Sequence, residues 1–223
     1  MNHPTPAPVE STDALAALRR IRATRPKAHP EVPSVIERCE LCAVPVSAEH
    51  RHVVNLDSRA LLCACRPCSL LFEYQGAELS YRTVPDRHLA LPPLPRQQWD
   101  SLEVPVGLAF IFRNSRQERT VVCYPGPAGA TEADLPTDAS EAFAEAVPDV
   151  EAVLVRARED GFDRFVVPID ACYALVGHLR VLWRGFDGGS EAHARVAEFF
   201  ADIERKTERK AERETERKAV RPA

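Results

Sequence analysis

Four cysteines arranged as two Cys-x2-Cys pairs constrain this chain more than any other feature of its sequence. The pairs are Cys39–Cys42 and Cys65–Cys68, with 22 residues between them. A short Cys-x2-Cys turn can aim both sulfurs at one ion, and four thiolates close a tetrahedron. The sequence therefore predicts a structural four-cysteine metal site, because no coordination position is left open.

Zinc is the metal that this pattern favours, and iron is the main alternative. Rubredoxin-type iron sites also use two Cys-x2-Cys pairs, but they usually carry Gly just after the second cysteine, where this chain has Ala43 and Ser69. Cys63 could be a fifth thiol at the site, as in an iron–sulfur cluster, or could pack beside the ligands. We assign the two remaining cysteines, Cys123 and Cys172, to the core, because they lie on apolar runs.

The residues around the cysteines predict a treble-clef-like module over residues 35–78. Residues 50–56 and 60–64 are typical of two strands joined by a short turn, and Pro67 suits the first turn of a helix that continues to Gly76. A cysteine knuckle, a hairpin and a helix follow one another in that order. A module of about 40 residues buries little core by itself, so the metal would hold it together.

Four other segments are expected. Residues 1–34 read as a flexible Pro-rich arm, and residues 79–103 as an extended Pro-rich connector, since proline lacks an N–H and fixes φ. Residues 104–204 read as an α+β domain, and residues 205–223 as a charged tail that is helical or disordered.

The α+β domain is expected to hold a mainly antiparallel sheet with helices on one face. This fold class follows from four apolar strand-like runs and three helical patterns, which occur in the mixed order β-β-α-β-β-α-α. The expected strands are 106–114, 119–126, 150–157 and 163–169, and the expected helices are 136–149, capped by Thr137 or Asp138, 170–183 and 190–203.

His50 and His52 alternate with Arg51 just ahead of the second cysteine pair, which resembles the metal-binding hairpin of HNH nucleases. The helix after Cys68 lacks the His or Asn that those enzymes need there. The histidines could instead form a polar strand face or contact a partner. The sequence contains no phosphate-binding Gly loop and no nucleophile elbow, so we assign no catalytic residue and favour a non-catalytic role.

The net charge and the hydropathy of the chain indicate which partners and which cellular compartment to expect. The net charge is -4 and the pI is about 6.0, which disfavours broad binding to nucleic acid. The sequence shows no apolar run of about 20 residues and no secretory signal pattern. We therefore expect a cytoplasmic protein, in whose reducing compartment clustered cysteines bind metal.

Several motifs together resemble an uncharacterised bacterial family encoded near [NiFe]-hydrogenase genes. They are "CELC", "EHRH", "LLCACRPCSLLF", "VPID-CY-LVG-LR--WRGF-GG" and a closing "FF", and they span about residues 36–204. The resemblance implies an accessory or adaptor protein that assists assembly of, or electron transfer to, a hydrogenase, with a hydrogenase subunit or maturation factor as partner. The alternatives are a rubredoxin-like iron electron carrier and a degenerate HNH-type nuclease.

Overall fold

The computed structural model describes residues 36–73, 80–126, 129–135, 141–185 and 188–220. By its contacts the chain divides into residues 1–36 and residues 37–223. The expected arm at 1–34 lies outside the described residues, apart from this division. The expected cysteine module and α+β domain both fall within the second unit.

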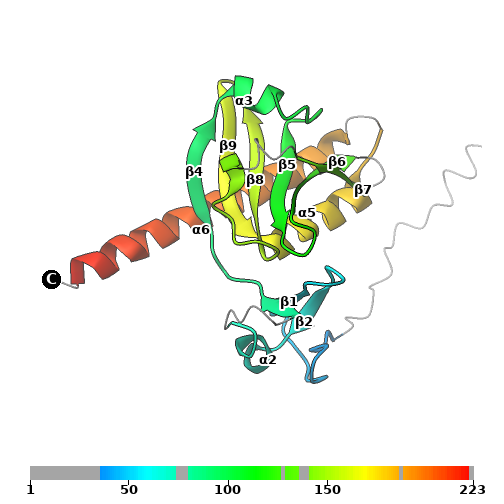
Figure 1. Cartoon of the computed structure of the whole chain (residues 1–223), viewed down its shortest axis with the longest axis vertical. Helices are drawn as coiled ribbons and strands as arrows, with labels where there is room; N and C mark the ends of the chain where they lie inside the picture. The colour runs from blue at the N-terminus through cyan, green and yellow to red at the C-terminus, as the bar shows by residue number, and fades with distance from the viewer. Residues whose placement is uncertain (1–35, 74–79, 127–128, 136–140, 186–187, 221–223) are drawn as a thin grey trace, which may run out of the picture. The chain divides into compact units, whose positions relative to one another are not determined.

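The architecture is α+β, with strands that pair antiparallel throughout the described residues, as the sequence predicts (Figure 1). A three-stranded sheet has the order β2-β1-β3, and a six-stranded sheet has the order β4-β9-β8-β5-β6-β7. The strands are β1 (Arg51–Asn55), β2 (Leu61–Ala64), β3 (Tyr81–Thr83), β4 (Leu89–Leu94), β5 (Leu108–Asn114), β6 (Arg119–Gly126), β7 (Gly129–Asp134), β8 (Glu151–Arg158) and β9 (Gly161–Pro168).

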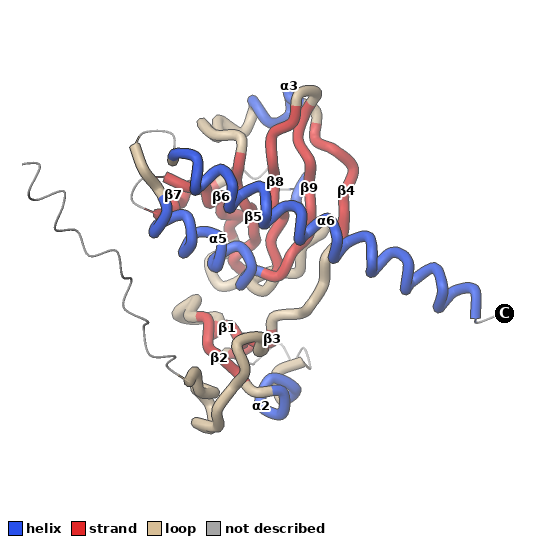
Figure 2. Tube along the Cα trace, turned by 180° about the vertical axis from the view of Figure 1, so that it is seen from behind, coloured by secondary structure: helices blue, strands red, loops and turns tan. Residues whose placement is uncertain are grey.

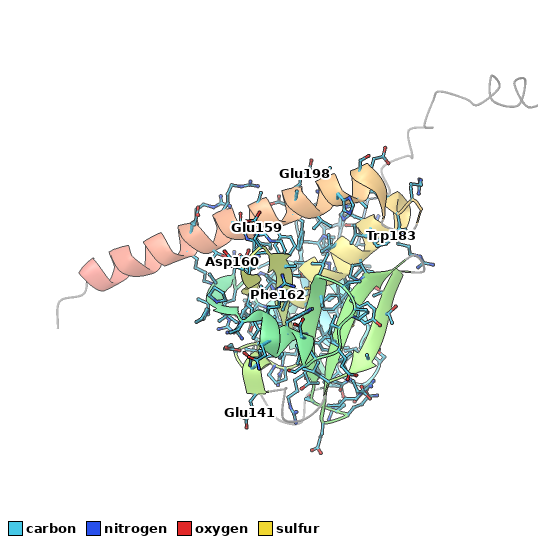
Figure 3. All side chains as sticks on the ribbon, turned by 90° about the horizontal axis from the view of Figure 1, so that it is seen from above. Glu141, Glu159, Asp160, Phe162, Trp183 and Glu198 are labelled. Atoms are coloured by element: carbon cyan, nitrogen blue, oxygen red, sulfur yellow. The ribbon has the colours of Figure 1, made fainter. Side chains whose placement is uncertain are left out.

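Both faces of the six-stranded sheet are covered, which explains why its central strands are apolar almost without interruption. The helices α5 (Ile169–Leu182) and α6 (Gly189–Val220) cross one face (Figure 2). On the other face, Trp99 stacks on Phe162 with ring centroids 4.5 Å apart. Figure 3 shows Trp183 on the side of the long helices and Glu141 on the opposite side of the sheet. The prediction that helices cover one face of the sheet is therefore incomplete, because the other face is covered as well.

The second face is covered by short elements instead of a long helix. They are α3 (Arg96–Asp100) and the 3-10 turn η1 (Glu141–Phe143). The helix expected over 136–149 is wrong for its described part, because only this single 3-10 turn forms there before Pro148. The expected caps Thr137 and Asp138 lie outside the described residues.

The segment 79–103 is part of both sheets, although the sequence predicts an extended connector there. It supplies β3 to the small sheet and β4 to the large one. β4 is an edge strand, and its register with β9 shifts between Leu91 and Leu94, on either side of Pro92 and Pro93. Proline is tolerated at such a place, because an edge strand pairs on one side only.

Helix α6 continues through the charged repeat to Val220. Its first half is held to the sheet by Arg156 of β8, whose guanidinium lies 2.6 Å from Glu204 and 2.7 Å from Asp163 of β9. The same guanidinium lies over the ring of Phe200, 4.2 Å from its centroid. Ion pairing and a cation–π contact thus fix the helix on this face.

Two Gly-to-Ala substitutions should change stability in opposite directions. Gly161 has a φ of +149°, and a Cβ there would lie 2.9 Å from the carbonyl oxygen of Leu94, so Gly161→Ala should destabilise the fold by more than about 1 kcal/mol. Gly177 lies inside α5, and a Cβ added there would meet nothing within 4 Å, so Gly177→Ala should stabilise the fold by up to about 1 kcal/mol. Urea unfolding of both variants measures the difference, and equal effects would contradict the argument.

Candidate metal centre

The first cysteine pair lies in a tight knuckle formed by backbone hydrogen bonds. The N–H of Cys39 donates to the carbonyl of Val44 at 2.8 Å, and the N–H of Ala43 donates to the carbonyl of Cys39 at 2.7 Å. Ala43 has a φ of 63°, the left-handed conformation that favours glycine. Ala43 therefore takes the conformation for which the rubredoxin pattern uses Gly, and its side chain does not argue against iron.

The second pair opens a helix, as the sequence predicts. Cys65 is the N-cap of α2 (Arg66–Leu70), Pro67 lies in the first turn, and the N–H of Ser69 donates to the carbonyl of Cys65 at 3.0 Å. The helix ends at Leu70, earlier than expected. The order of knuckle, hairpin and short helix is the expected one, and its assignment to the treble-clef fold stays a prediction.

The four sulfurs converge. The Sγ atoms of Cys39, Cys42, Cys65 and Cys68 lie within 4.8 Å of one another, and those of Cys42 and Cys65 are 3.7 Å apart. Four Zn–S bonds of about 2.3 Å at tetrahedral angles would place sulfurs about 3.8 Å apart. The cluster can therefore hold a metal ion, and its donor set suits zinc and iron alike.

The electrostatics at this cluster also suit a cation. Burial by itself raises the pKa of the Cys39 thiol, but backbone N–H groups of Cys65, Leu41 and Cys42 more than offset this and lower the pKa to about 6. Hydrogen bonds with the thiols of Cys65 and Cys42 raise the pKa of Cys68 to about 12. The thiolate of Cys39 thus forms readily, and the thiol of Cys68 holds a proton that a bound ion would displace.

The small sheet shares an apolar core with the large one. Val54 and Leu56, which follow the histidines, and Val84, which follows β3, belong to the same buried cluster as Phe112 and Ile169. Polar contacts join the same two parts: Arg59 with Glu132, Asp57 with Arg116, and Arg82 with the carbonyl of Pro148. The position of the cysteine cluster is thereby tied to the main core.

Sequence reasoning missed the arrangement of Cys63 and the two histidines. Cys63 does not join the four-cysteine cluster but lies with His50 and His52, whose ring centroids are 4.7 Å apart. His52 is only partly exposed, and its Nδ1 lies 2.8 Å from Asp170 at the start of α5. The histidines are therefore not simply a polar strand face. The cross-strand register, in which His52 pairs with Cys63, was the signal that could have revealed this group.

The other two cysteines are buried, as the sequence predicts: Cys123 in β6 and Cys172 in α5 are both in the core. Burial raises the pKa of the Cys123 thiol to about 12. Burial likewise raises the pKa of the Cys172 thiol. Both thiols therefore stay protonated, which suits packing and not metal binding.

A pocket of about 550 Å³ opens beside the histidines. Its lining combines His50, His52 and Asp170 with cationic side chains, namely Arg51, Arg66 and Lys206.

Among the described residues, no helix is long and apolar enough to cross a membrane.

The fold and the site define an α+β protein with a four-cysteine cluster that can hold a metal ion. The chain belongs to DUF5947, a family of unknown function, whose family model matches residues 38–207. That match agrees with the resemblance to an uncharacterised family. Comparison with curated proteins gave no match, and comparison with solved structures gave none either.

Proposed function

We propose that this chain is a non-catalytic, zinc-binding accessory protein that presents the surface around its four-cysteine cluster to a protein partner. The observation that carries the proposal is the exposure of large apolar side chains there. Every one of these side chains lies within three residues of a cluster cysteine: Leu41, Val44, Leu70 and Leu71.

Such exposure has a physical cost unless a partner covers it. Contiguous apolar surface on a monomer marks interaction sites, and isolated apolar residues do not. Only two of the other described residues of the compact unit 37–223 are large, apolar and exposed, namely Leu89 and Val181. An ion that fixes the knuckle and α2 would also fix this surface, since it orders both segments that carry it.

Zinc is proposed over iron because of the second cysteine pair. Rubredoxin-like sites use two knuckles, whereas here Cys65 and Cys68 belong to the start of a helix. The rubredoxin-like carrier remains the alternative, since the four sulfurs alone suit either metal. The nuclease alternative is not proposed, because the helix after Cys68 lacks the His or Asn that those enzymes need there.

The partner is proposed from the resemblance to a family encoded near [NiFe]-hydrogenase genes. Under this proposal the chain is cytoplasmic and binds a hydrogenase subunit or a maturation factor. Such a helper needs a binding surface and a stable fold but no active site, which agrees with the assignment of no catalytic residue.

Leu71→Glu should release the partner, while Val181→Glu should not. Both side chains are 70% exposed, so neither change should disturb the fold, but only Leu71 lies within three residues of a cluster cysteine. A charge placed within an apolar interface should reduce the recovered partner at least about 10-fold. The measurement is affinity purification from the organism that encodes the chain, grown while its hydrogenase is expressed, with quantification of hydrogenase components.

The proposal has two separate points of failure. Absence of hydrogenase components with the unchanged chain would refute the hydrogenase connection. Equal recovery with Leu71→Glu and Val181→Glu would refute the surface around the cluster as the binding site. Zinc content, measured on the same preparations, should stay unchanged in both variants.

A further inference from the structure

A second group of metal-ligating side chains lies on the β1–β2 hairpin and shares no residue with the four-cysteine cluster. A ring nitrogen of His50, a ring nitrogen of His52 and Sγ of Cys63 all lie within 4.8 Å of one another. The hairpin explains this convergence. Side chains at i and i+2 share a strand face, and His52 is paired directly with Cys63 across the ladder.

The surroundings of His52 fix which ring nitrogen is free. Its Nδ1 lies 2.8 Å from Oδ2 of Asp170. An ionised carboxylate only accepts hydrogen bonds, so Nδ1 carries the proton and Nε2 keeps a lone pair. Asp170 is itself held, since its Oδ1 accepts the N–H of Ala171 at 2.7 Å. A carboxylate that orients a histidine in this way is typical of histidines that bind metal.

His50 is prepared in the same manner. Its Nδ1 lies 2.9 Å from the carbonyl oxygen of Ser47, which can only accept, so Nε2 again keeps the lone pair. The side chain is 8% exposed, and its Nε2 is buried without a hydrogen-bond partner among the described residues. A buried polar atom without a partner is costly and needs an explanation.

We propose that His50, His52 and Cys63 bind one divalent transition-metal ion through the two Nε2 atoms and Sγ. Imidazole and thiolate are the ligands that zinc-type ions prefer. Negative charge also surrounds the group, because the carboxylates of Asp170, Glu37 and Glu40 lie next to His52, His50 and Cys63 respectively, and this charge suits a cation. Binding would also give the buried Nε2 of His50 its missing partner.

This site differs from the four-cysteine cluster because it leaves one coordination position of the ion open. Three protein ligands occupy three corners of a tetrahedron, and a water or a small ligand takes the fourth. Both histidines line the pocket of about 550 Å³, so a small ligand can reach this side of the site. The inference is independent of the proposed accessory function.

Zinc stoichiometry of the full chain tests the proposal. Metal-free protein is reconstituted with Zn²⁺ under reducing conditions, desalted and analysed for zinc and protein. The unchanged chain should retain two ions, and Cys63→Ser and His50→Gln should each retain one. Cys65→Ser should lose the other ion, so the two sites are assigned separately.

Asp170→Asn provides a test that does not remove a ligand. Asn keeps the size of the side chain but weakens the orientation of His52, so the affinity for the second ion should fall about 10- to 100-fold. The affinity of the four-cysteine ion should not change. Titration with Zn²⁺ against a chromophoric chelator resolves the two affinities.

Matched controls come from a histidine and a cysteine outside both sites. His178→Gln and Cys123→Ala should each retain two ions, since His178 is exposed on α5 and Cys123 is buried in β6. Near-UV circular dichroism verifies that each variant is folded. One ion in the unchanged chain at saturating zinc, two ions in the Cys63→Ser, His50→Gln double variant, or unchanged affinities in Asp170→Asn would each overturn the proposal.

Discussion

Cys65→Ser should abolish binding at the four-cysteine cluster and destabilise the whole unit 37–223. Serine does not replace a thiolate ligand, and structural zinc contributes on the order of 10 kcal/mol to folding in small metal-binding modules. The loss should spread because Val54 and Val84 pack in the same core as Phe112. We expect a loss of about 5 kcal/mol or more, which lowers the Tm by about 10–20 °C. Calorimetry together with metal analysis measures both effects.

Cys172→Ala is the matched control for this prediction. Cys172 is fully buried between α5 and the large sheet, so its truncation should cost about 1–2 kcal/mol and leave the metal content unchanged. Wild-type stability and full metal content in Cys65→Ser would contradict the structural role. The absorption spectrum of the unchanged chain also tests the metal, since a zinc protein is colourless and a rubredoxin-like iron protein is red.

Arg87→Ala should be among the most destabilising substitutions outside the cysteine cluster. Glu151 is fully buried at the start of β8, and its carboxylate pairs with Nε of Arg87 at 2.7 Å and with Nη2 at 2.5 Å. Removal of Arg87 leaves a buried carboxylate without its counter-charge, which costs about 3–5 kcal/mol in such pairs. Because the Arg87 side chain is 35% exposed, we expect a cost at the lower end of that range, about 3 kcal/mol.

Arg119→Ala provides the comparison for an exposed pair. Arg119 contacts Asp134 at the surface, where ion pairs contribute about 0–1 kcal/mol. Urea unfolding of both variants gives the two free energies. Arg87→Lys should fall between them, since lysine restores the charge but not the two-point contact. A cost for Arg87→Ala no larger than for Arg119→Ala would refute the argument from burial.

Local patterns predict much of the large sheet. β5, β6, β8 and β9 were all expected from apolar runs, and the polar turn at 115–118 correctly predicts a hairpin. α5 and the start of α6 follow from their apolar periodicity. In each of these elements, the apolar residues that form the sequence pattern are also the residues buried in the core. The local composition is therefore enough to predict the element.

Elements that depend on distant partners could not be predicted in this way. β4 contains two prolines and forms because β9 offers an edge. β7, "GATEAD", has no strand-like composition and pairs with β6 across a short connection. The contact of His52 with Asp170, 118 residues further along the chain, leaves no local trace. The four cysteines could be predicted from their spacing along the sequence, because binding of a single ion requires that spacing.

The prolines of β4 bear on how the protein behaves at high concentration. A sheet can extend from one chain to another only where an edge strand presents free N–H groups to a strand of the second chain. Pro92 and Pro93 have none to offer, and the shifted register beside them bends that edge away from regular pairing. Fibril-like stacking therefore finds only an interrupted template along β4, which gives the large sheet one side that resists aggregation.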